Sequence, residues 1–313
     1  MSEDEFLSKA QQIPLQQLQW NLANQQGVDV WVRRDDLIDA QLSGNKFYKL
    51  FYNLRAAHKL GYSQLLSFGG AYSNHLYALA ATAKIHGFKS IGVIRGERPT
   101  QLSATLVDAE AWGMQLHFVS RADYRERCSG ELMAELLTRY GDFFEIPEGA
   151  ANVYGTMGTM ALGAAINQQV KSDFNAVCVA AGTANTLAGI AAGLAKNDCS
   201  STASVLGFSV LKGEGDLAAQ LIKYQKVIGC KTSNWRLITG YHCGGYAKKL
   251  PNSLRQFMFE FENETTLALD PVYTLKMCWG VAQLLAQNYW PPGSRLVLVH
   301  TGGLQGRRGF NLK

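Results

Sequence analysis

The stretch QLLSFGGAYSNHLYALAATAKIHGFKSIGVIR, residues 64–95, contains one complete strand–helix–strand unit. Its ends, QLLSF and SIGVIR, are short β-rich apolar runs typical of strands, and residues 73–87 between them have the periodicity of a helix. Strands joined in this way run parallel, because the helix returns the chain to the edge at which the first strand began. This unit therefore predicts an α/β fold.

The same order repeats along nearly the whole chain. Further strands are predicted at 28–34, 115–119, 142–146, 175–180, 204–210, 236–240 and 295–300. Further helices are predicted at 46–60, 101–113, 130–140, 156–171, 184–195, 215–226, 247–259 and 273–289. Because nine strands are many for one sheet, we predict two parallel-sheet α/β domains: a small one at 49–154 and a large cofactor-binding one at 1–48 and 155–313.

Composition excludes several classes of partner. The 313 residues include 30 basic and 25 acidic ones, and the basic residues are scattered in pairs rather than gathered in a stripe, so no nucleic-acid partner is expected. Six cysteines form no C-x-x-C motif, which fits a reducing cytosol and a cytoplasmic location. No apolar run approaches the roughly 18 residues of a membrane span, so no membrane partner is expected either.

Ligands of parallel sheets collect at the carboxyl ends of strands, so the strand-to-helix turns are the places to search. One candidate is QLSGNKFYKL, residues 41–50, which places Lys46 in the first turn of a helix behind a Ser-Gly-Asn turn. Ser43 or Asn45 can simply cap the helix and leave Lys46 in water. Alternatively, the partial positive charge of a helix N-terminus disfavours the lysine cation, lowers its pKa and supplies the neutral amine that a Schiff base with an aldehyde requires.

A second turn, FGGAYSNHLYALAA at 68–81, offers a hydroxyl, an amide and an imidazole from Ser73, Asn74 and His75 where a helix begins. The same residues also suit an ordinary helix cap, and that interpretation stays open.

A third turn follows the strand at 175–180 and combines small residues with short hydroxyl and amide side chains. Its residues are Gly182, Thr183, Ala184, Asn185 and Thr186. Free N–H groups and hydroxyls at a helix start make a phosphate cup, although a tight turn chosen for packing has the same composition. The turn matches neither the Walker nor the dinucleotide-binding glycine pattern.

Two more turns lie near the end of the chain. Tyr273 and Thr274 begin a helix in LDPVYTLKM, and Thr301 ends the last strand in VLVHTGG. One lysine, one phosphate cup and several small polar groups at strand ends together indicate a phosphorylated aldehyde cofactor, for which pyridoxal phosphate fits; the motifs include no metal site.

The motifs GNKxxKL, GGxxSNH, GTxxT, DPVYT and HTGG, in this order, resemble the 1-aminocyclopropane-1-carboxylate deaminase and D-cysteine desulfhydrase family. The resemblance runs from about Val30 to Gly303. It implies the tryptophan synthase β fold, which is fold type II of the pyridoxal phosphate enzymes, and a homodimer.

The same resemblance implies roles for single residues around the cofactor. Lys46 is implied to be the Schiff-base lysine, and Lys49 is implied to hold the phosphate together with residues 182–186. Asn74 is implied to bond the phenolic oxygen of the ring, and Tyr273 is implied to lie against the ring.

Other residues are implied to meet the substrate, a small amino acid. Ser73 is implied to lie beside the substrate carboxylate and the reacting carbon, with Asn74, His75 and Tyr72 as neighbours. Tyr246 in CGGYAKK matches the second active-site tyrosine of the family. Lys46, Ser73 and the two tyrosines, Tyr246 and Tyr273, are the implied catalytic residues.

Two positions distinguish the branches of the family. Deaminases resemble DPVYE and HLGG, whereas desulfhydrases resemble DPVYT and HTGG, and here the residues are Thr274 and Thr301. A hydroxyl at the pyridine nitrogen makes a weaker electron sink than a carboxylate, which suffices when a good leaving group such as a thiolate departs. We therefore expect α,β-elimination from a small amino acid, in the first place D-cysteine, giving pyruvate, ammonia and sulfide.

The chain also departs from the family pattern at Ser43, Tyr48, Phe51 and Tyr72. These departures keep two alternatives open: a deaminase of 1-aminocyclopropane-1-carboxylate or another small amino acid, and a pyridoxal-phosphate-binding protein without turnover. A nucleotide-dependent Rossmann enzyme is disfavoured because its glycine fingerprint is missing.

Overall fold

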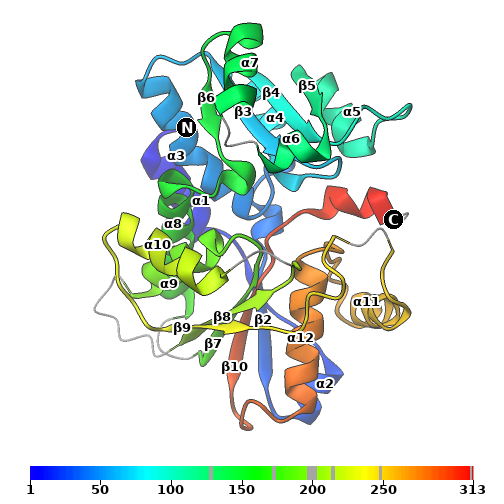
Figure 1. The fold of residues 1–313 in the computed structure, drawn as a ribbon. Coiled ribbons are helices and arrows are strands. Elements are labelled where there is room, and N and C mark those ends of the chain that lie inside the picture. Colours follow the sequence, from blue (N-terminus) through cyan, green and yellow to red (C-terminus); the bar gives the residue numbers. More distant parts are fainter. Residues whose placement is uncertain are drawn as a thin grey trace.

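A computed structural model describes the chain except residues 127–129, 171–173, 196–202, 213–215, 247, 248, 311 and 313. Figure 1 shows one sheet with its helices at each end of the molecule, and the C-terminal segment in red between the two. The predicted α/β architecture with two parallel-sheet domains is confirmed.

The larger sheet has six strands in the order β1-β2-β10-β7-β8-β9. They are β1 (Leu15–Gln17), β2 (Asp29–Arg33), β7 (Ala176–Ala181), β8 (Ser204–Ser209), β9 (Trp235–Ile238) and β10 (Arg295–Val299). All neighbouring pairs are parallel except β1 and β2. The sequence did not predict β1, because a strand of one leucine and two glutamines has no hydrophobic alternation.

The smaller sheet has four parallel strands in the order β5-β4-β3-β6. They are β3 (Gln64–Gly69), β4 (Lys89–Arg95), β5 (Met114–Val119) and β6 (Phe144–Ile146). All four lie inside the span 49–154 that we assigned to the small domain; the boundaries of that span stay a prediction.

The helices cover both sheets. They are α1 (Glu3–Gln11), α2 (Asn21–Gln25), α3 (Asn45–Lys59), α4 (Asn74–His86), α5 (Ala104–Ala111), α6 (Arg121–Arg125), α7 (Gly130–Tyr140), α8 (Val153–Val170), α9 (Asn185–Ala195), α10 (Leu217–Val227), α11 (Asn252–Thr265) and α12 (Thr274–Ala286). Three 3-10 turns complete the order: η1 (Asp35–Leu37), η2 (Glu148–Ala150) and η3 (Leu304–Phe310). Within the described part of the chain, no helix is long and apolar enough to span a membrane.

The predicted helix at 247–259 starts too early, and three helices were not predicted. Helix α11 begins at Asn252, because Pro251 occupies its N-cap and a proline is tolerated at a helix start but not inside; residues 247 and 248 of the predicted helix lie outside the described residues. Helix α1 was missed, although Ser2 and Glu5 form a capping box that indicates it. Helices α2 and α6, each of five residues, were missed as well.

Helix α8 is built to lie close to two other helices. A Cβ atom at Gly158 would overlap the carbonyl oxygen of Tyr48 in α3, and one at Gly163 would press on the backbone of Ile190 in α9. Glycine at these positions therefore brings α3, which carries Lys46, and the turn that opens α9 to the same side of the molecule.

Candidate active site

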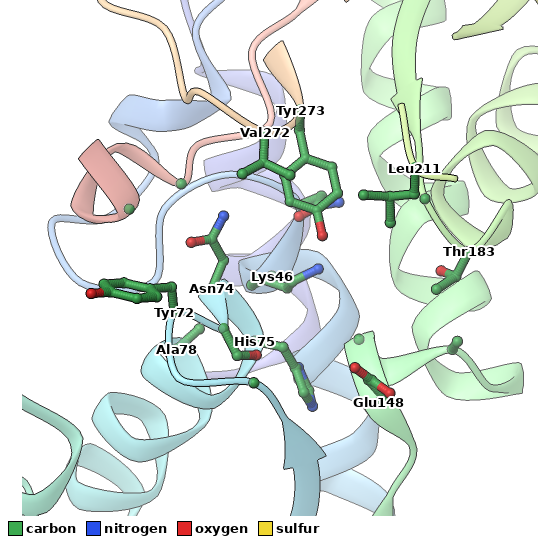
Figure 2. Close-up of a pocket in the computed structure, with 18 of the residues that line it drawn as sticks. Lys46, Tyr72, Asn74, His75, Ala78, Glu148, Thr183, Leu211, Val272 and Tyr273 are labelled. Atoms are coloured by element: carbon green, nitrogen blue, oxygen red, sulfur yellow. The ribbon is translucent and has the colours of Figure 1, made fainter. Parts of the chain in front are cut away.

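A cavity of about 1080 Å³ lies where the carboxyl ends of both sheets meet. Figure 2 shows that its walls come from all the turns singled out above, with Lys46, Asn74, Thr183 and Tyr273 around one space. The structure therefore brings together residues that lie more than two hundred positions apart in the chain.

Lys46 is positioned by contact between two glycine-containing turns. Gly44 has a φ of +69°, and a Cβ atom there would overlap the carbonyl oxygen of Thr301. The backbone N–H of Asn45 donates to that same oxygen over 3.3 Å. The close approach of these turns fixes the start of α3 and aims Lys46 at the cavity.

The amine of Lys46 has an unusual acidity. Burial lowers its pKa to about 8, while the nearby Asp270 carboxylate acts in the opposite direction. The sequence argument attributed such a shift to the helix N-terminus, whereas removal of water is the larger cause here. The neutral amine that attack on an aldehyde requires is therefore accessible near physiological pH.

Asp270 is a residue of this cavity that the sequence interpretation missed. Its Oδ1 accepts hydrogen bonds from the backbone N–H groups of Val272 (3.1 Å) and Tyr273 (2.5 Å). Burial raises the pKa of Asp270 to about 6, while these two hydrogen bonds and a further one from the Asn74 amide act in the opposite direction. The sequence signal for this residue is an aspartate just before Pro271 at the start of a helix, because aspartate at that place accepts hydrogen bonds from backbone N–H groups.

Ser73 and Asn74 stand at the N-terminus of α4 and line the cavity. The Ser73 hydroxyl accepts from the N–H of Leu76 over 3.2 Å, so it caps the helix as one interpretation of the sequence held. Asn74 accepts a 2.5 Å hydrogen bond at Oδ1 from Nε2 of Gln305, a second residue that the sequence did not indicate. This turn therefore both caps helix α4 and lines the cavity.

His75 lies beneath Lys46 in Figure 2 and is almost completely buried. The Ser67 hydroxyl donates its proton to the carbonyl of Ile146 over 2.5 Å, so His75 Nε2 is the donor in its 2.8 Å bond to Ser67. Burial and the two lysines, Lys46 and Lys49, hold the pKa of His75 well below its usual range. His75 is therefore neutral, and its Nδ1 has no partner among the described residues.

The predicted phosphate turn reaches the cavity with four of its five residues, Gly182, Thr183, Ala184 and Thr186. Asn185 does not reach it. Its buried amide donates to Asn152 O (3.1 Å) and to Thr156 Oγ1 (2.6 Å), both next to or within α8, because the side chain leaves the helix on the packed face.

One contact joins α3 to this turn, and a second joins α3 to η2. Asn45 donates from Nδ2 to the Thr186 hydroxyl over 3.0 Å. Lys49 also lines the cavity, and its Nζ donates to the carbonyl of Gly149 over 3.2 Å. Burial, with a smaller effect of Lys46, holds the pKa of Lys49 well below its usual range.

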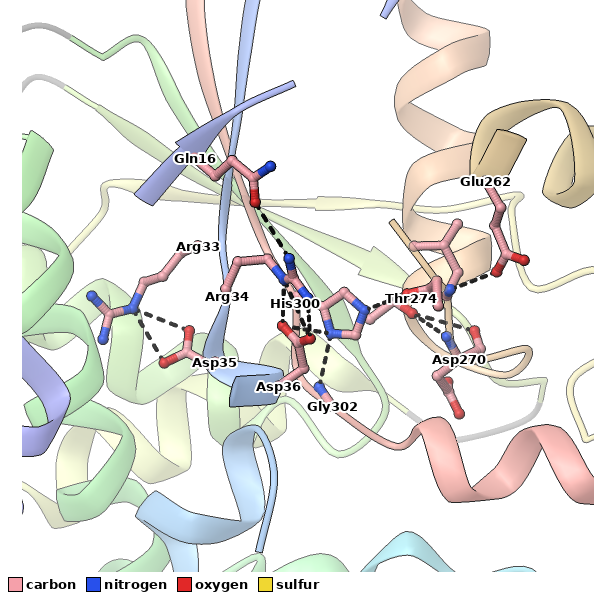
Figure 3. Close-up of polar contacts among 12 residues, drawn as sticks. Gln16, Arg33, Arg34, Asp35, Asp36, Glu262, Asp270, Thr274, His300 and Gly302 are labelled. Atoms are coloured by element: carbon pink, nitrogen blue, oxygen red, sulfur yellow. Dashed lines mark hydrogen bonds and ion pairs between the residues drawn. The ribbon is translucent and has the colours of Figure 1, made fainter. Parts of the chain in front are cut away.

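The remaining predicted residues separate into two groups. Tyr246 and Tyr273 line the cavity with their hydroxyl oxygens 2.7 Å apart, and Thr301 lines it as well. Thr274 does not: it is fully buried, accepts from the N–H of Asp270 over 2.7 Å and donates back to the Asp270 carbonyl over 3.3 Å (Figure 3). At the first position of α12, its hydroxyl satisfies the turn instead of facing a ligand.

His300 holds the two C-terminal turns together. Its Nε2 donates to the carbonyl of Ala268 over 2.8 Å, and its Nδ1 accepts from the N–H of Gly302 over 3.3 Å (Figure 3). Residues 9–302, which include Lys46, residues 182–186 and Thr301, match the protein family "Pyridoxal-phosphate dependent enzyme".

The chain belongs to this family. Pyridoxal phosphate is its cofactor, and the protein is a pyridoxal-phosphate-dependent lyase. Family membership confirms the cofactor that the lysine and the phosphate turn predicted.

Relatives match over more than nine tenths of this chain. A Pyrococcus horikoshii protein named as a provisional 1-aminocyclopropane-1-carboxylate deaminase is 29% identical over 94% of this chain and 90% of its own. An Arabidopsis thaliana protein named bifunctional D-cysteine desulfhydrase/1-aminocyclopropane-1-carboxylate deaminase is 27% identical over 92% of this chain and 75% of its own. The crystal structure of an ACC deaminase homologue has a TM-score of 0.79 at 28% identity, covering 98% of this chain and 96% of that one.

The residues present fit pyridoxal phosphate. Lys46 offers an amine of lowered pKa, and the Thr183 and Thr186 hydroxyls lie at a turn suited to an anion. Beneath Lys46, the buried His75 Nδ1 is a polar atom without a protein partner among the described residues. These groups would hold the cofactor by its aldehyde carbon and its phosphate.

Of the four departures from the family pattern, two lie outside the cavity and two line it. Tyr48 and Phe51 do not line the cavity: the Tyr48 hydroxyl donates to Asp35 over 2.6 Å, and Phe51 stacks on Phe6 of α1 with ring centroids 3.9 Å apart. Ser43 and Tyr72 do line it. Tyr72 is 52% exposed, and Figure 2 shows its ring directed away from Lys46.

Proposed function

We propose that this enzyme catalyses α,β-elimination from a small amino acid, with D-cysteine as the first candidate substrate. The observation that carries the proposal is the pair of residues at the two branch positions. Thr301 lines the cavity and Thr274 is turned into the protein, so neither position offers a carboxylate to the pyridine ring. A ring without that carboxylate is the weaker electron sink, which suits loss of a good leaving group from Cβ.

Bound pyridoxal phosphate supplies the sink for the electron pair left at Cα. Lys46 Nζ is the group that takes the Cα proton, because its lowered pKa leaves part of the amine neutral at working pH. Ser73 and Asn74, at the start of α4, hold the substrate carboxylate where the helix end presents N–H groups. The Cβ–S bond then breaks with its electron pair on sulfur, and addition of water yields pyruvate and ammonia.

Tyr246 and Tyr273 are proposed to act on the departing sulfur. Their hydroxyl oxygens lie 2.7 Å apart at the cavity wall, so the hydrogen bond between them fixes the orientation of the hydroxyl that donates it. A phenol oriented in this way can donate to a thiolate as it leaves.

Ring-opening deamination of 1-aminocyclopropane-1-carboxylate is the second candidate. It is favoured by the names of the relatives and by Asp270, which places one carboxylate in the cavity from a different position.

A substrate panel on the cofactor-loaded enzyme separates these candidates. We expect sulfide and pyruvate from D-cysteine, pyruvate from β-chloro-D-alanine, and essentially no keto acid from the cyclopropane amino acid. Ring opening faster than sulfide release would establish the second candidate. No turnover of any compound, with a borohydride-reducible visible absorption band intact, would indicate a binding protein.

A homodimer and a cytoplasmic location are proposed on the family resemblance and on the cysteine pattern alone. A monomeric mass in light scattering at micromolar concentration would contradict the first.

A further inference from the structure

Three arginines line the part of the cavity that belongs to the smaller sheet: Arg95, Arg121 and Arg125. The strand register explains why they are together. Arg95, the last residue of β4, is paired with Val119, the last residue of β5, and the N–H of Gly96 donates to the Val119 carbonyl over 2.8 Å. Arg121 follows two residues later at the start of α6, so both side chains begin at the same sheet edge.

Helix α6 gathers the cluster further. Arg121 and Arg125 are four residues apart on one helix and therefore share a face, where two like charges repel. The ring of Tyr124 connects this helix to Arg95, whose guanidinium carbon lies 5.6 Å from the ring centroid. Three positive charges thus lie within one small region of the wall.

No carboxylate among the described residues pairs with these three arginines. Nearby cations are paired: Arg98 with Glu110 (3.2 Å) and Arg308 with Asp108 (2.6 Å). Asp123, the acidic residue within α6 itself, accepts from the hydroxyl of Ser120 over 2.7 Å. The cluster is therefore a concentration of positive charge that the described protein leaves uncompensated.

Two of the three carboxylates that line the same cavity among the described residues lie at the other edge of the smaller sheet, and the third, Asp270, comes from the turn before α12. Glu145 belongs to β6, and Glu148 follows it in η2. Strand β3 separates β6 from β4, so two strand spacings, roughly 10 Å, lie between these elements. An anion beside Arg95 would therefore meet the arginines before the glutamates.

The arginines also lie next to the loop that carries the proposed substrate residues. A Cβ atom at Gly70 would lie 3.5 Å from Nη2 of Arg95, and Gly70 is only three residues before Ser73. At about 1080 Å³, the cavity is at the upper end of the volumes that hold drug-sized ligands, so a substrate side chain longer than that of cysteine has room.

We propose that Arg95, Arg121 and Arg125 form a subsite for a second anionic group, carried by the substrate beyond Cβ. The substrate class is then a β-substituted alanine whose leaving group bears a carboxylate or a phosphate, which guanidinium groups bind with paired hydrogen bonds. The proposal rests on the proposed elimination and adds no co-reactant: the bond from Cβ to the substituent breaks, and the substituent leaves with the electron pair and its anionic group.

Matched ligands test the subsite on the cofactor-loaded enzyme. The carboxylate arm compares S-carboxymethyl-D-cysteine with its neutral carbamoylmethyl analogue, and the phosphate arm compares O-phospho-D-serine with D-serine. We expect the anionic member of at least one pair to bind about 10- to 100-fold more tightly in calorimetry, the range for hydrogen bonds to charged groups. The same ratio is expected in kcat/KM, and added salt is expected to reduce it.

The variant R95Q/R121Q/R125Q should lose this preference while D-cysteine turnover changes less than twofold. R98Q is the matched control, because Arg98 follows the same strand but is already paired with Glu110. Equal binding of the charged and neutral members by the wild type, or an unchanged preference in the triple variant, would overturn the subsite. Turnover of D-cysteine without any anion preference would overturn the subsite and support the proposed elimination. Tight anion binding without turnover would support the subsite and contradict the proposed elimination.

Discussion

Nε2 of Gln305 donates a 2.5 Å hydrogen bond to Oδ1 of Asn74. The bond joins the C-terminal turn η3 to the first residue of α4, across 231 positions of sequence. Because the Asn74 oxygen is occupied, its amide nitrogen is the atom that bonds Asp270, and only the second N–H of that amide is left for a ligand. Gln305 is therefore a positioning residue for the asparagine that the family resemblance assigns to the cofactor.

Replacing Gln305 by alanine should weaken pyridoxal phosphate retention by about 1 kcal/mol, the usual net value of one hydrogen bond. Covalent attachment to Lys46 should persist, and it is read as visible absorbance lost on borohydride treatment. Retention is measured by equilibrium dialysis. Gln287→Ala, at the exposed end of α12, is the control, and equal retention in both variants would contradict the role of Gln305.

The acidity of Lys46 predicts a pH dependence of cofactor capture. The folded protein loses the Lys46 proton near a pKa of about 8, well below the ordinary value, so the neutral amine becomes available as pH rises. The rate at which the apoprotein captures pyridoxal phosphate should therefore rise with pH and level off above about 8. Stopped-flow absorbance measures this rate.

Removing the charge of Asp270 should shift that profile. The Asp270 carboxylate favours the charged amine and thus keeps the pKa of Lys46 from falling further. In Asp270→Asn, the midpoint of the rate profile should move to lower pH, and in the control Asp142→Asn, an exposed carboxylate, it should stay in place. A midpoint that moves upward in Asp270→Asn would show that the sign is wrong.

The two threonines should respond differently to removal of their hydroxyls. Thr274→Val leaves the buried N–H of Asp270 without its acceptor, at a cost of about 1–3 kcal/mol in the free energy of unfolding. Thr301→Val should cost less stability and instead change the absorption spectrum of the bound cofactor and the rate of elimination, because Thr301 lines the cavity. Urea unfolding of the apoproteins checks the first statement, which a fully stable Thr274→Val would refute.

Contact between the turns of Gly44 and Thr301 predicts a large difference between two glycine substitutions. Gly44 and Gly61 both have positive φ, so alanine at either position strains the backbone, and at Gly44 the ψ of −149° adds to this because that region is adopted essentially by glycine alone. Only at Gly44 would the new Cβ atom also overlap the carbonyl of Thr301, whereas Gly61 faces open space. Gly44→Ala should therefore have a clearly lower Tm, or a lower folded yield, than Gly61→Ala; equal Tm values would show that the turns do not need this contact.

The sequence by itself determined the order and type of most elements, the two parallel sheets, and the two turns, that of Lys46 and that of residues 182–186, from which the cofactor was predicted. These features depend on local information. Hydrophobic periodicity marks strands such as β3 and β4 within a few residues of their ends, and the family motifs are contiguous stretches. Elements with little periodicity, such as β1, were missed for the same reason.

Only the tertiary structure decided which side of each turn a side chain occupies. Thr274 and Asn185 stand at helix starts in the predicted motifs, yet the turn of Asp270 and the packed face of α8 take up their polar groups. Asp270 and Gln305 enter the site because distant segments pack beside Asn74. A side chain at a turn bonds whichever partner lies within about 3 Å, and that partner is set by packing between elements remote in sequence, which local periodicity does not encode.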